Sequence, residues 1–174
     1  MNDPRSRGVG VRTQEARRGR VAEIRHIGIV VSDLAASLAF YAGLLGLRLG
    51  NGGEESGKEL DRIFGMPNVH LRTQKLLTDR GDARVELVEL LEPTHVTGAA
   101  RGLTDVGITH FAITVDDIEL TYRELRSAGV TFVSAPERDA SGFAKVAFCR
   151  DPDGNLIELI EVQRKGFFEA PAQR

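Results

Sequence analysis

One segment of the chain occurs twice. H26-I-G-I-V-V-S-D-L-A near the beginning is matched by H110-F-A-I-T-V-D-D-I-E in the second half, and the alignment superposes Asp33 on Asp117. An internal repeat of this kind indicates two copies of one supersecondary unit that bury a common core. Each copy alternates branched apolar residues with small or polar ones, which is typical of a strand with two different faces.

A helix is expected after each of these strands, because apolar residues then recur at helical spacing. Residues able to cap a helix stand at both ends of both segments. They are Ser32 or Asp33 with Gly46 in the first half, and Asp116 or Asp117 with Gly129 in the second. Both halves therefore read as a strand followed by a helix.

Three short strand-like runs follow each helix. They cover residues 47–50, 68–76 and 83–92 in the first half, and 130–133, 143–149 and 155–161 in the second. The turn D151-P-D-G-N joins the last two runs. The first half also contains an insertion, N51-G-G-E-E-S-G-K-E-L-D-R-I-F-G-M-P. We expect this insertion to be a surface loop or a cover for a cavity. The sequence thus predicts an α+β protein of two tandem βαβββ modules, whose curved mixed sheet surrounds a cup with the helices outside. The expected boundaries are a flexible basic tail at 1–21, modules at 22–95 and 106–163, a linker at 96–105 and a second tail at 164–174.

Composition excludes several classes of partner. The formal net charge of −2 gives no reason to expect a nucleic-acid partner, and no apolar run is long enough to span a bilayer. The single cysteine, Cys149, rules out an internal disulfide and fits a reducing cytoplasm; its apolar neighbours predict a buried thiol.

Strand alternation predicts where the chemically active side chains point. In the first strand His26 lies on the face opposite Ile27 and Ile29, and the repeat places His110 in the same way. Each half also ends in a strand that carries a glutamate. We select Glu89, in V88-E-L-L, and Glu158, in I157-E-L-I; Glu86 is the competing choice for the first.

Two imidazoles and two carboxylates on one concave surface form a set of ligands for a divalent cation. Neutral imidazole suits Zn, Ni, Co or Fe(II), and the carboxylates also admit Mn. The predicted ligands are His26, Glu89, His110 and Glu158. A single strand histidine is usually a core residue, so the prediction depends on the repeat. His70, Arg72 and Gln74 share one face of a strand, which lines the same cavity or faces solvent.

At these residues the chain resembles the vicinal oxygen chelate superfamily, which includes glyoxalase I, methylmalonyl-CoA epimerase, fosfomycin-resistance enzymes, extradiol dioxygenases and bleomycin-binding proteins. The resemblance covers roughly residues 22–162 and rests on the paired modules, F40-Y41, L44-L-G-L and D151-P-D-G-N-L-I-E-L. The His-Glu-His-Glu set is similar to that of bacterial glyoxalase I. E89-L-L-E-P is more similar to the epimerase branch, and Val30 and Pro93 stand where glyoxalase I tends to carry Arg and Asn.

The resemblance implies a metal-dependent lyase, isomerase or epimerase that acts on a carbon next to a carbonyl through a metal-bound enediolate. Its substrate would be a small molecule with vicinal oxygens, and Glu158 or Glu89 would move the proton. Two alternatives stay open: a ring-cleaving Fe(II) dioxygenase that uses His26, His110 and Glu158, and a non-catalytic protein that binds small molecules such as drugs. A homodimer is expected, with the site formed within one chain or across two.

Overall fold

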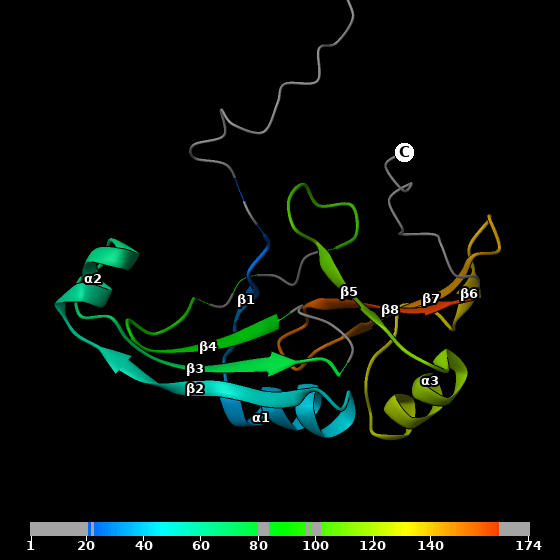
Figure 1. Ribbon diagram of the computed structural model, residues 1–174, viewed down its shortest axis with the longest axis horizontal. Helices are drawn as coiled ribbons and strands as arrows, with labels where there is room; N and C mark the ends of the chain where they lie inside the picture. The colour runs from blue at the N-terminus through cyan, green and yellow to red at the C-terminus, as the bar shows by residue number, and fades with distance from the viewer. Residues whose placement is uncertain (1–20, 22, 80–83, 97, 99–101, 164–174) are drawn as a thin grey trace, which may run out of the picture.

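The computed structural model describes residues 21, 23–79, 84–96, 98 and 102–163, so the predicted tails lie outside the described residues except for Val21. The first module consists of β1 (Ile27–Val30), α1 (Leu34–Leu38), the π-helix η2 (Ala39–Leu44), β2 (Arg48–Ser56), α2 (Lys58–Phe64), β3 (His70–Leu77) and β4 (Arg84–Glu92). The second consists of β5 (His110–Thr114), α3 (Ile118–Ser127), β6 (Glu137–Arg138), β7 (Ala144–Arg150) and β8 (Leu156–Val162). Figure 1 shows the two modules side by side, as the predicted α+β class with two tandem modules requires.

Each module contains one mixed four-stranded sheet. The strand orders are β1-β4-β3-β2 and β5-β8-β7-β6. The repeated strand is parallel to the last long strand of its own module in both cases, β1 to β4 and β5 to β8, and the other pairs are antiparallel. β1 and β5 therefore form one edge of their respective sheets, and the residues that begin the repeat lie at these edges.

The helix boundaries follow from local capping chemistry. The Asp33 carboxylate accepts hydrogen bonds from the backbone N–H groups of Ala35 and Ala36 at 2.8 and 3.0 Å. The Asp117 carboxylate accepts from Leu120 N–H at 2.9 Å. These bonds satisfy donors that the first turn of a helix leaves free. Gly46 and Gly129, with φ of 73° and 88°, follow the helices in the left-handed region that favours glycine, so the predicted caps are confirmed.

One hydrophobic core is shared by the two modules. Side chains from α1, η2 and the first sheet pack in the same cluster as those from α3 and the second sheet; its fully buried members are Val31, Tyr41, Leu76, Leu87, Ile118, Leu125, Ala147, Cys149, Ile157 and Leu159. Burial raises the pKa of the Cys149 thiol to about 12, as expected for a thiol inside an apolar core. The prediction of a buried cysteine is confirmed.

Polar contacts also join the modules. The Tyr41 hydroxyl donates to Asp151 Oδ2 at 2.8 Å, and both side chains are buried. Ser32 donates to the Asp153 carboxylate through its backbone N–H, at 3.1 Å, and through its hydroxyl. The predicted turn at residues 151–155 thus contacts the start of the first helix, and Gly154 supplies the expected positive φ, 86°.

Two expectations about local structure differ from the fold. The insertion is not a loop: its first residues extend β2 to Ser56, and the rest forms α2. Pairing with β3 explains the strand, and glycine is required at residue 52 because a Cβ there would lie 2.6 Å from the Thr73 carbonyl oxygen. Residues 130–133 contribute only an isolated bridge, between Phe132 and Cys149, while β6 takes the edge position. Among the described residues, no helix is long and apolar enough to cross a membrane.

Candidate metal centre

A histidine and a glutamate lie against each other in each module. His26 Nε2 is 3.0 Å from Glu86 Oε2, and His110 Nε2 is 3.3 Å from Glu158 Oε2. The exposed fractions of the side chains also agree: 37% and 16% in the first pair, 35% and 19% in the second. We call these pairs the first and second half-sites.

Strand register explains why the two half-sites are alike. Gly28 is the Cα partner of Glu86 across β1 and β4, and Ala112 is the partner of Glu158 across β5 and β8. His26 lies two residues before Gly28, and His110 two residues before Ala112, so each histidine is on the same face of its strand as that small residue. Helix-facing residues of the same strands, such as Ile29, are in the core. The histidines therefore lie on the opposite face of each sheet, which we call the open face.

The structure does not bring Glu89 to His26; it brings Glu86. Val85 and Leu87 are buried in the core, so Glu86 between them points to the open face. Glu89, two residues after Leu87, lies on the same face of β4 as these core residues. Glu89 Oε2 instead lies 3.6 Å from Arg72 Nη1. The likeness of V88-E-L-L to I157-E-L-I favoured Glu89, but V85-E-L-V matches I157-E-L-I equally well and has the correct register.

The three residues expected in a substrate pocket also lie on the other face. Side chains alternate between the two faces of a strand, and that of Lys75 is on the open face. The side chains of His70, Arg72 and Gln74 therefore lie on the opposite face, together with that of buried Leu76. Gln74 donates to the Gly50 carbonyl at 2.8 Å. The structure thus places them away from the half-site.

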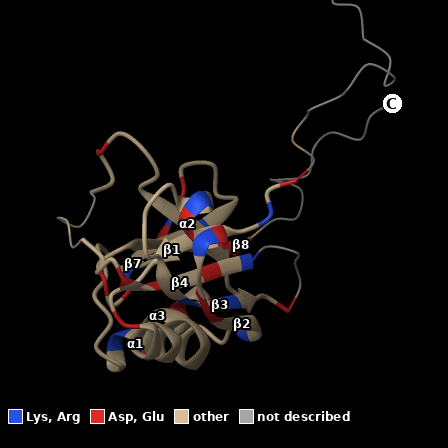
Figure 2. Ribbon diagram, turned by 90° about the vertical axis from the view of Figure 1, so that its left-hand side faces the viewer, with Lys and Arg blue, Asp and Glu red and all other residues tan. Residues whose placement is uncertain are grey.

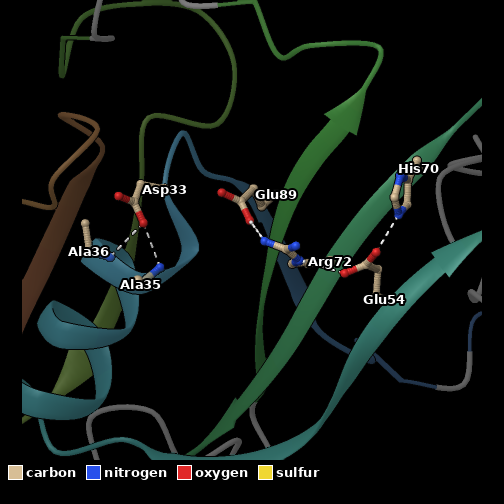
Figure 3. Close-up of polar contacts among 7 residues, drawn as sticks. All are labelled: Asp33, Ala35, Ala36, Glu54, His70, Arg72 and Glu89. Carbon is tan, nitrogen blue, oxygen red and sulfur yellow. Dashed lines mark hydrogen bonds and ion pairs between the residues drawn. The ribbon is translucent and has the colours of Figure 1, made fainter.

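His70 and Arg72 belong to a row of charged side chains across β4, β3 and β2, on the side of α1 (Figure 3). The Glu54 carboxylate accepts from Arg72 Nε at 2.8 Å and lies 2.7 Å from His70 Nε2. Both contacts lower the pKa of the Glu54 carboxyl, and the hydrogen bond from Arg72 has the larger effect. Figure 2 shows acidic and basic residues mixed along these strands, and within the row the Arg72 guanidinium is paired with both carboxylates, Glu54 and Glu89.

Three further side chains contact the half-sites, and none of them was singled out from the sequence. Lys75 Nζ lies 3.1 Å from Glu86 Oε1. The Phe148 ring lies edge-to-face against His110, with centroids 5.2 Å apart. Thr109 Oγ1 lies 2.9 Å from His110 Nδ1, so that ring has a partner at both nitrogens. The register could have found Lys75 and Phe148, because they are the Cα partners of Glu86 and Glu158.

Each half-site offers one imidazole nitrogen and one carboxylate, which are suitable ligands for Zn, Ni, Co, Fe(II) or Mn. Two such ligands are fewer than a stable site for these ions uses. Within the part of the chain that the structure describes, no three His, Cys, Asp or Glu side chains are close enough to hold one ion. The donor chemistry therefore fits a metal, but one chain presents it as two separate halves.

Comparisons with known proteins agree with this architecture. The sequence profile of the Glyoxalase/Bleomycin resistance protein/Dioxygenase superfamily matches residues 23–159. The chain is 30% identical over 140 residues to a probable lactoylglutathione lyase of Synechocystis, a match covering 80% of the chain and 95% of that protein. It is 31% identical over 141 residues to the lactoylglutathione lyase of Haemophilus influenzae, covering 80% and 92%.

Solved structures show the same fold. A glyoxalase family protein from Bacillus cereus superposes with a TM-score of 0.76 at 22% identity, over 83% of the chain and 97% of that protein. The trypanothione-dependent glyoxalase I of Leishmania major superposes with a TM-score of 0.56 at 26% identity, over 81% and 87%. The profile match spans both repeated modules and both half-sites, and the chain belongs to the Glyoxalase/Bleomycin resistance protein/Dioxygenase superfamily, as a glyoxalase-like member.

Proposed function

We propose that the chain is a divalent-metal-dependent lyase or isomerase that moves a proton at a carbon next to a carbonyl. Its metal ligands are His26, Glu86, His110 and Glu158. The observation that carries this proposal is the repeated His–Glu pair, held at matching register on the open faces of both sheets. The relatives named lactoylglutathione lyase support the reaction class.

A second copy of the chain completes the four-ligand set in this proposal. Each half-site is about one-third exposed at its histidine and belongs to an edge strand with no further partner among the described strands. An exposed sheet edge that carries an incomplete set of ligands supports a surface that another protomer covers. A two-fold dimer would join the first half-site of each protomer to the second half-site of the other.

A bound divalent ion supplies Lewis-acid polarisation of the substrate carbonyl, which makes the neighbouring C–H more acidic. The chain's own task is then to take up and return the proton, and Glu158 fits this role better than Glu86. Both oxygens of Glu86 are engaged, one by His26 and the other by Lys75. Among the described residues, Glu158 has one such contact, to His110 at the longer distance of 3.3 Å. Its carboxylate accepts the proton and returns it to the same or the adjacent carbon, with no net oxidation.

Hydrogen–deuterium exchange tests this assignment. The metal-loaded protein is incubated in D₂O with a panel of α-hydroxycarbonyl compounds and thioesters that includes lactoylglutathione, and the α-proton signal is followed by NMR. Glu158→Gln should abolish the exchange while retaining the folded circular dichroism spectrum. Glu89→Gln is the matched control and should exchange like the unmodified chain, because Glu89 lies on the other face. Normal exchange in Glu158→Gln would overturn this choice of base.

A further inference from the structure

The two half-sites differ in the residue that pairs with the glutamate across the sheet. Lys75 is the Cα partner of Glu86 in the first sheet, and Phe148 is the Cα partner of Glu158 in the second. One half-site therefore carries an ammonium group where the other carries an aromatic ring. Lys75 Nζ lies 3.1 Å from Glu86 Oε1, and its side chain is 40% exposed. An ammonium has three N–H donors, and Glu86 is the one ion-pair partner of Lys75 among the described residues, which leaves donors for a ligand on the open face.

Charge balance gives this difference a consequence for ligand choice. Without a metal, Glu86 neutralises Lys75. In the proposed site the carboxylates of Glu86 and Glu158 balance the two charges of the cation, and neutral histidines add none. The Lys75 ammonium is then the uncompensated charge of the site, held beside a metal ligand. Such a charge attracts an anionic group and disfavours a neutral one.

Resting on the proposed function, we infer that Lys75 selects substrates that carry a carboxylate or similar anionic group next to their metal-chelating oxygens. Phe148 offers an apolar wall to the rest of the molecule, because its ring packs on His110 in the other half-site. Lys75 acts on ligand choice and is separate from the proton transfer assigned to Glu158. The substrate class is thus a small molecule with two vicinal oxygens, an anionic group next to them and one apolar side.

Two probes with the same chelating head separate the contribution of this charge. Malate and 2-hydroxybutyrate both present vicinal hydroxyl and carboxylate oxygens, but malate ends in a second carboxylate and 2-hydroxybutyrate in a methyl group. Titration calorimetry on the cobalt-loaded protein should show malate binding roughly three- to tenfold more tightly, the range of one partly exposed charge-assisted contact. Lys75→Met should remove this preference and Lys75→Arg should keep most of it.

A second readout distinguishes a lost charge from a damaged site. Removing a positive charge beside a bound dication should tighten cobalt binding, by roughly two- to fivefold, while malate binding weakens. A structural defect would weaken both. Lys145→Met is the matched control, since Lys145 pairs with Glu119 of α3 on the helix side at 2.7 Å; it should change neither quantity.

A cobalt-loaded Lys75→Met protein that still prefers malate overturns the inference and leaves the proposed metal site intact. An unmodified protein that binds malate and 2-hydroxybutyrate equally well would also overturn the inference and leave the proposed metal site intact. A protein that binds no cobalt overturns the proposed function and the inference together, because Lys75 would then stay neutralised by Glu86.

Discussion

Removal of the Tyr41 hydroxyl is expected to destabilise the whole fold, because its hydrogen bond joins the two modules. The hydroxyl donates to Asp151 Oδ2 at 2.8 Å, and Asp151 is only 5% exposed. Asn155 and Asp153 supply the other donors to this carboxylate, at 2.8–3.0 Å. Tyr41→Phe keeps the ring and its edge-to-face contact with Phe40, so no cavity forms and only the hydrogen bond is lost.

A buried hydrogen bond to a charged group contributes about 1.5–3 kcal/mol to the free energy of unfolding. The lower half of that range is expected, because Asn155 Nδ2 still donates to the same Asp151 oxygen at 2.9 Å. For a chain of this length the full range corresponds to a decrease in melting temperature of roughly 3 to 12 °C. Urea unfolding followed by circular dichroism should show a lower midpoint with an unchanged m-value.

The chain contains its own control. Tyr122 is the second of two tyrosines; its ring packs on Phe132 with centroids 4.7 Å apart, and no described residue accepts from its hydroxyl. Tyr122→Phe should change the free energy of unfolding by less than about 0.5 kcal/mol. Equal effects of Tyr41→Phe and Tyr122→Phe would refute the claim that the Tyr41–Asp151 bond holds the modules together.

Two further predictions concern single side chains. In a calorimetric titration with metal, Thr109→Val should bind roughly ten- to hundredfold more weakly, because the Thr109 hydroxyl orients His110 through Nδ1. Thr109→Ser keeps the hydroxyl and should restore binding. Arg25→Ala, at the matched position before His26, should bind metal like the unmodified chain. Cys149 should not react with a disulfide reagent at pH 8 in the folded protein and should react fully in urea, because burial raises its pKa to about 12; rapid labelling of the folded chain would contradict the assigned core.

The repeated strand made the fold predictable. It appears twice with the same alternation of branched and small residues, and each copy leads into an aspartate that caps a helix. These are local signals, and the structure confirms the capping residues and the burial of Ile29 and Val31. The extension of β2 through the Gly-rich start of the insertion was not predictable in this way. Those residues form a strand because β3 pairs with them, not because of their own propensity.

The candidate site was predictable only in part, for a reason that concerns register. Two Val-Glu-Leu segments lie three residues apart in β4, and a shift by an odd number of residues moves a glutamate to the other face of the sheet. The pairing of Gly28 with Glu86 decides between them, and it is a non-local contact. The distance between the two half-sites likewise depends on how the modules pack, which no short motif encodes.

The proposed metal site combines His26 and Glu86 of one protomer with His110 and Glu158 of another. Two variants test it directly: His26→Ala/Glu86→Gln and His110→Ala/Glu158→Gln. Each should be metal-free when expressed alone, whereas co-expression should restore about a quarter of the metal of the unmodified protein, measured by inductively coupled plasma mass spectrometry, if two-fold dimers form at random. A co-expressed pair that stays metal-free, while the unmodified protein binds metal, would contradict the claim and place each site within a single chain.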